Sequence, residues 1–131
     1  MSVPKSKRKQ TPMQFVHNAR VIEGFCIEHW HEKTSCVLKK CIEISAEIYV
    51  NVTCANSIYP TTKTEAFERA LYLKKALASV YALKVQLSLA YRHNLTSSGV
   101  AKELNEYIER EKGLIKGTIK KDKERYKGLP L

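Results

Sequence analysis

The sequence predicts an all-α fold in which four helices form an up-down-up-down bundle. Glycine and proline, the residues that most often break helices, number only five and four among 131 residues. Apolar residues recur with the 3.6-residue period of a helix, and no stretch alternates as a half-buried strand does. Short polar turns separate four such periodic segments, which is typical of antiparallel bundles. We therefore expect a four-helix bundle over residues 11–121, a flexible basic arm over 1–10 and a flexible basic tail over 122–131.

The first helix is expected from about Pro12 to Glu32. Thr11 can cap it, and Pro12 suits its first turn because an N–H there would have no partner. Its apolar stripe comprises Phe15, Ala19, Ile22, Cys26 and His29 or Trp30. The second helix is expected from about Ser35 to Ser57, with a stripe of Val37/Leu38, Cys41/Ile42, Ile44/Ser45, Ile48/Tyr49, Val52 and Ala55. Pro60 then ends the pattern, since proline disfavours helix at the preceding residue.

The third helix is expected from about Lys63 to His93, where Thr62 and Glu65 have the spacing of a capping box. Sixteen of the twenty-two residues from Ala70 to Tyr91 are apolar. They belong to two stripes, although a helix that packs only within its own bundle needs one. The first stripe is Ala70, Leu73, Leu77, Val80, Leu83, Leu87 and Ala90, and the second is Phe67, Leu71, Ala78, Ala82, Val85 and Leu89.

Two stripes indicate either a central helix or a helix that buries a second face against another chain. No helix of a small bundle is fully surrounded, so self-association into a ring or barrel-like homo-oligomer is favoured. Its interface is expected at Phe67, Leu71, Ala78, Val85 and Leu89. A membrane span is disfavoured, because several lysines interrupt the segment and charges near a bilayer centre cost several kcal/mol each.

The fourth helix is expected from about Val100 to beyond Ile119, after a polar turn over residues 94–99. Its stripe is Leu104, Tyr107/Ile108, Leu114/Ile115 and Ile119. Its lysine-rich end suits the negative pole of the helix dipole. If the helix continues far enough, one face carries Lys112, Lys116, Lys120, Lys123 and Lys127.

The net charge of +10 is concentrated at the two ends of the chain. It divides as +4 over residues 1–10, +1 over 11–111 and +5 over 112–131. This pattern is typical of a protein that meets a polyanion, and Lys and Arg neutralise the phosphates of nucleic acid. A solubilising surface with disordered tails explains the charge equally well. The candidate nucleic-acid-binding residues are Lys5, Lys7, Arg8, Lys9, Arg20, Lys39, Lys40, Lys112, Lys116, Lys120 and Lys121.

The sequence offers little for catalysis, and we expect no enzyme, metal or cofactor. His29 and His31 are two apart, so on a helix they point in different directions and cannot meet one ion. No Gly-rich phosphate loop is present, and the cysteines lack the local pattern of a nucleophile. The four cysteines lie in apolar helical patterns, which predicts buried free thiols in a reducing compartment. No apolar segment follows the basic N-terminus, so we expect no signal peptide and a cytoplasmic protein.

Three segments resemble a known family. They are Ser2–Arg8 at the start, the run from Ala55 to Thr62 with Glu65, Glu68-Arg69, Tyr72-Leu73, Leu83 and Gln86-Leu87 after it, and Leu114–Gly117 with Lys120-Lys121-Asp122. Together they are similar to the accessory variability determinant (Avd) of bacterial and phage diversity-generating retroelements. The same broad family includes proteins encoded in intervening sequences of 23S ribosomal RNA genes. One departure is Thr118, where members of the family often have tryptophan.

The resemblance implies a pentameric barrel of four-helix bundles without catalytic activity. It also implies a reverse transcriptase as partner and a basic surface that contacts template RNA or an RNA–DNA hybrid. The leading hypothesis is therefore a non-catalytic accessory subunit that supports mutagenic cDNA synthesis. The alternatives are an oligomeric helical scaffold that binds only protein and, with less support, a small enzyme that uses a buried cysteine or histidine.

Overall fold

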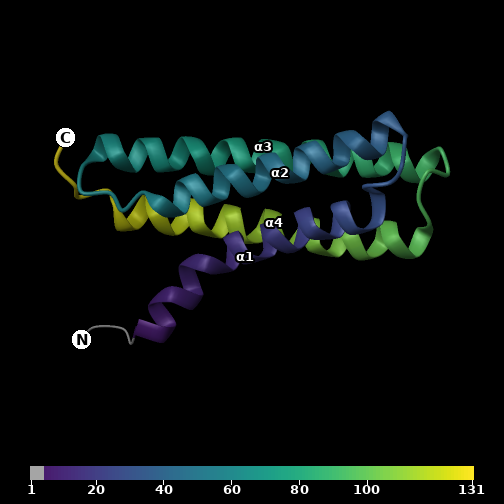
Figure 1. Ribbon diagram of the computed structural model, residues 1–131. Coiled ribbons are helices and arrows are strands. Elements are labelled where there is room, and N and C mark those ends of the chain that lie inside the picture. Colours follow the sequence, from purple (N-terminus) through teal and green to yellow (C-terminus); the bar gives the residue numbers. More distant parts are fainter. Residues whose placement is uncertain (1–4) are drawn as a thin grey trace.

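The computed structural model describes residues 5–131, with side chains from Gln14 onward, and this part of the chain contains four helices and no strand. The helices are α1 (Lys5–Trp30), α2 (Cys36–Ser57), α3 (Lys63–Arg92) and α4 (Ser98–Arg125). Successive helices run in opposite directions, so α1 begins and α4 ends at the same end of the bundle (Figure 1). Helices α1 and α3 each pack against both α2 and α4. The predicted four-helix bundle is thus confirmed.

The helix starts follow from local capping. The side chains of Ser35 and Ser97 accept hydrogen bonds from the backbone N–H groups of Leu38 (3.4 Å) and Val100 (3.2 Å). At α3, Thr62 accepts from the N–H of Glu65 at 3.2 Å, as the capping box predicts. The Glu65 carboxylate in turn accepts from the hydroxyl and the N–H of Thr61, and these bonds hold its pKa below the ordinary value.

The core consists mainly of the predicted stripes, and it also includes Phe25 and Ala76, which no predicted stripe contains. Its largest fully buried apolar side chains lie on all four helices and include Phe15, Ile22, Leu38, Ile48, Leu73, Leu83, Leu104, Ile108 and Ile115. Two members of the first α3 stripe, Ala70 and Leu77, are only half-buried. The cysteine prediction holds for Cys26 and Cys41. Cys54 is only half-buried, and Cys36 is exposed because it occupies the first position of α2.

Both ends of the chain differ from the prediction. Residues 5–10, expected in a flexible arm, form the first turns of α1, and these turns lean away from the bundle (Figure 1). Pro12 lies inside α1, where its missing N–H leaves a carbonyl one turn earlier without its helical bond, which favours a bend. Residues 1–4 lie outside the described residues.

The expected flexible tail over 122–131 is instead packed on the bundle. Helix α4 continues through Asp122 to Arg125, and Asp122 is only 8 % exposed. Beyond the helix, the carbonyl of Pro130 accepts a 2.7 Å hydrogen bond from the backbone N–H of Lys63. The burial of Asp122 and the hydrogen bond to Pro130 explain why this end of the chain is ordered, although its glycine and proline predicted a flexible tail.

Two polar pairs cross the core. Asn18 on α1 donates from Nδ2 to the Glu111 carboxylate at 3.0 Å and to the Tyr107 carbonyl at 3.0 Å, both on α4. Glu111 is fully buried, its Oε2 has no hydrogen-bond partner, and burial raises its pKa to about 8. The second pair, Arg69 with Asp122, lies at the end of the bundle where α4 finishes. Neither pair belongs to a predicted stripe.

Candidate nucleic-acid interface

The last third of α4 lies against α1 near Gln14 and Phe15, and we call this part of the molecule the basic end. Lys116, Lys120 and Lys121 are exposed there, and none of them has an acidic partner among the described residues. The Lys116 ammonium lies 5.7 Å from the centre of the Tyr81 ring on α3. A cation over an aromatic face is held in position while its outer side stays open to solvent. These three lysines are therefore available to an anion.

Lys112 is less available than the sequence suggests. Its ammonium lies 2.6 Å from the carboxylate of Glu109, which also binds Lys84 on α3. Hydrogen bonds from Lys112 and Lys84 lower the pKa of Glu109 to about 2, so this carboxylate remains charged at neutral pH. One negative charge is thus shared by two lysines, and the side chain of Lys112 is half-buried.

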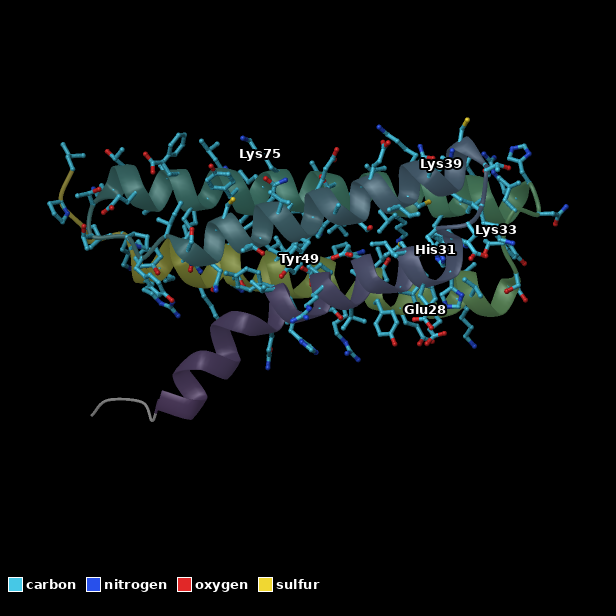
Figure 2. The ribbon with its side chains drawn as sticks, viewed as in Figure 1. Glu28, His31, Lys33, Lys39, Tyr49 and Lys75 are labelled. Atoms are coloured by element: carbon cyan, nitrogen blue, oxygen red, sulfur yellow. The ribbon has the colours of Figure 1, made fainter. Side chains whose placement is uncertain are left out.

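The remaining predicted residues fall in three places. Lys5, Lys7, Arg8 and Lys9 lie on the first turns of α1, whose side chains are outside the described part, and their backbone is at the basic end (Figure 1). Lys39 and Lys40 lie near the start of α2, at the opposite end of the bundle; Lys39 is labelled there in Figure 2. Lys40 is also 3.5 Å from Glu43. Arg20 is exposed on α1. The fold therefore divides the predicted residues into a basic end and a separate group on α2.

Helix α3 contributes lysines that sequence reasoning missed. Lys63 and Lys74 on α3 lie with Lys123 on α4, and with Lys127 just beyond the end of α4, around a groove of about 470 Å³. Roughly fifty residues separate the two pairs along the chain, so no local spacing connects them. Only the antiparallel packing of α3 on α4 brings them together.

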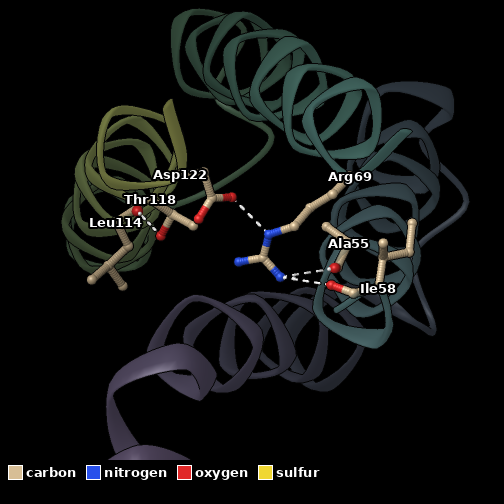
Figure 3. Close-up of polar contacts among 6 residues, drawn as sticks. All are labelled: Ala55, Ile58, Arg69, Leu114, Thr118 and Asp122. Atoms are coloured by element: carbon tan, nitrogen blue, oxygen red, sulfur yellow. Dashed lines mark hydrogen bonds and ion pairs between the residues drawn. The ribbon is translucent and has the colours of Figure 1, made fainter. Parts of the chain in front are cut away.

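A buried ion pair fixes the geometry of the basic end. The Arg69 Nε donates to Asp122 Oδ2 at 2.6 Å, and its Nη1 donates to the carbonyls of Ala55 (3.1 Å) and Ile58 (3.3 Å). Arg69 thereby ties α4 to the end of α2 across the interior of the bundle (Figure 3). Lys121 and Lys123 flank Asp122 in sequence, so this pair also sets where the neighbouring lysines project.

An apolar stripe remains uncovered on the outer side of α3. Phe67 is 63 % exposed, Leu71 42 % and Val85 60 %. Ala78 is exposed as well, whereas Leu89 is half-buried. Four of the five residues expected at an oligomer interface are therefore open to solvent in the single chain, and the fifth is partly covered.

No described residues form a cluster that could hold a metal ion. Groups of three or more His, Cys, Asp or Glu side chains able to share an ion do not occur among them. Burial raises the pKa of the Cys26 thiol to about 12 and that of Cys41 to about 11, so both are protonated at neutral pH. None of the described helices is both long and apolar enough to cross a bilayer.

The chain matches no protein-family model, no curated protein and no solved structure.

Proposed function

We propose that this chain is a non-catalytic, self-associating accessory protein of a retroelement reverse transcriptase, which holds template RNA by its phosphate backbone. The Avd resemblance supplies the polymerase, the cytoplasm of a bacterium or of a phage-infected cell as the setting, and a pentamer as the assembly. The observation that most directly supports RNA binding is the grouping of lysines at the basic end. There, three unpaired lysines of α4 lie at the same end of the bundle as the basic first turns of α1.

The chemistry of the basic end favours backbone contacts over reading of bases. Lysine ammonium groups on a rigid helix neutralise phosphates and release counterions, and this gives affinity that depends little on sequence. Both α1 and α4 contribute basic residues. The positive surface therefore extends beyond a single turn of α4 and can contact several phosphates of a folded RNA.

The outer stripe of α3 supports self-association. From Phe67 to Val85 the exposed apolar side chains extend over about 27 Å of helix, at 1.5 Å per residue. A contiguous apolar surface on a soluble protein marks an interaction site. Packing against the same stripe, or a nearby one, of another copy would remove it from water.

A salt titration tests the RNA-binding part. We expect the logarithm of the association constant for a structured RNA to fall linearly with the logarithm of salt concentration. Replacing Lys116, Lys120 and Lys121 with glutamine removes three contacts and should reduce the slope by about 2 to 3. The matched control carries Lys33→Gln, Arg92→Gln and Lys102→Gln, which remove the same charge from exposed positions at the opposite end of the bundle, and its slope should change by less than about 1. Equal losses in the two variants would show general charge attraction, and an affinity independent of salt would refute phosphate binding.

The α3 stripe also favours a second candidate function, an oligomeric scaffold that binds only protein. In that case RNA would not bind at low salt, whereas the assembly would persist. The same titration, run with light scattering to follow the mass, separates the two functions.

A further inference from the structure

A groove lies between the first half of α3 and the last turns of α4. Its volume is about 470 Å³, within the usual range for binding pockets. The apolar lining comes from both helices and comprises Ala66, Phe67, Ala70, Leu73 and Ile119. Leu73 is fully buried beneath it, whereas Phe67 stands largely exposed at its edge. The groove is thus an apolar depression that opens to solvent.

Lysines surround this apolar lining. Lys63, Lys74, Lys123 and Lys127 all line the groove, and all are exposed. Of these four lysines, only Lys127 has an acidic partner among the described residues. That partner is Glu124 at 2.9 Å, and both side chains of the pair are exposed. The one acid that lines the groove, Asp122, is already paired with Arg69. The groove therefore has an apolar centre and a positive rim.

The walls of the groove are fixed before any partner arrives. Arg69 joins α3 to α4 through Asp122, and the backbone bond from Lys63 to Pro130 attaches the last residues to the start of α3. A groove that is formed in the free protein costs less conformational entropy on binding.

The lining favours a protein segment over a nucleobase. A base would need accessible donors and acceptors along its polar edges. The lining offers aliphatic groups, one phenylalanine, one tyrosine hydroxyl and ammonium groups, and its one carboxylate, Asp122, is buried and holds Arg69. Leucine-like side chains match the apolar centre, and carboxylates match the lysine rim. Two packed helices with an apolar channel between them are also the usual receptor for an amphipathic helix.

We propose that the groove between α3 and α4 binds an acidic amphipathic helix of a partner protein. Its apolar side chains would lie between Ala70 and Ile119, with glutamates or aspartates facing the four lysines. This inference rests on one part of the proposed function, the binding of a partner protein. It does not depend on RNA binding by Lys116, Lys120 and Lys121.

The test uses the full chain and a fluorescein-labelled synthetic peptide. The peptide places leucine at i, i+3, i+4 and i+7 and glutamate at the remaining positions. A permuted peptide of identical composition breaks the apolar stripe, and a second control replaces glutamate with lysine. Fluorescence anisotropy should show saturable binding of the amphipathic acidic peptide. The affinity for each control peptide should be lower by a factor of about ten or more.

Two variants locate the site. Lys63→Glu with Lys74→Glu reverses the charge of two of the four rim lysines and should lower the affinity for the acidic peptide about tenfold. Lys33→Glu with Arg92→Glu makes the same charge change at the opposite end of the bundle and should leave affinity within about twofold. A third variant, Ala70→Glu, places a carboxylate in the apolar centre and should abolish binding. Circular dichroism confirms the fold of each variant.

Three outcomes would overturn the inference. Equal binding of the permuted peptide would show charge attraction alone. Equal weakening by the two double variants would mean that no groove is involved. Loss of RNA affinity in Lys63→Glu with Lys74→Glu, without peptide binding to the wild type, would make the groove a nucleic-acid site. None of these results alters the salt slope assigned to Lys116, Lys120 and Lys121, so failure here and failure of RNA binding are distinguishable.

Discussion

Glu111 makes the stability of the bundle depend on pH in an unusual direction. Burial raises the pKa of its carboxyl to about 8, and a hydrogen bond from Asn18 offsets only part of this. In the unfolded chain the carboxyl has its ordinary pKa of 4.5. The folded state therefore binds the proton more tightly, and its contribution to stability is full below pH 4.5 and is lost as pH rises through 8. From pH 5 to 7 the free energy of unfolding should fall by about 3 kcal/mol, at about 1.4 kcal/mol per pH unit.

The Glu111→Gln variant isolates this effect, since glutamine keeps the shape and can still accept from Asn18 but does not titrate. Urea unfolding at several pH values, followed by circular dichroism at one protein concentration, gives the free energy of unfolding for both proteins. The wild type should lose stability relative to Glu111→Gln between pH 5 and 8. Parallel curves over that range would refute the reasoning, because they would mean that Glu111 is ionised in the folded state or reaches water.

Three further predictions concern packing and assembly. Arg69→Ala leaves Asp122 buried without its partner and should lower the free energy of unfolding by about 3 to 5 kcal/mol, whereas Arg69→Met with Asp122→Leu should recover most of it in the same urea assay. Leu83→Ala in the core should cost about 2 to 5 kcal/mol, whereas Leu71→Ala on the exposed stripe should change the stability of the dissociated chain by about 0.5 kcal/mol or less. Leu71→Glu with Val85→Glu should reduce the mass measured by light scattering to that of one chain, and an unchanged mass would remove α3 from the interface.

The helices and the core could be predicted because both depend on neighbours in sequence. Capping and the helical period are local, and Thr62 and the stripe residue Leu83 occupy the expected positions. The start of α1 is the least accurate boundary, since Pro12 is favoured at the first turn and yet lies inside a longer helix.

The polar pairs and the groove could not be predicted, because tertiary packing creates them. Arg69 and Asp122 are 53 residues apart, and Asn18 and Glu111 are 93 apart. From its own segment, Arg69 would be predicted as an exposed surface charge, but it is buried. The burial of Asp122 helps to order the last residues of the chain. The same packing sets Lys63 and Lys74 beside Lys123 and separates Lys39 from the basic end.

Sedimentation of the chain with RNA most directly tests the central claim, that this is a self-associating protein whose lysines hold a phosphate backbone. In buffer of about 50 mM salt, the account predicts one assembly of several 15.0 kDa chains that carries the RNA absorbance with it and releases it as salt is raised. A single 15.0 kDa species that sediments apart from the RNA at low salt would contradict it.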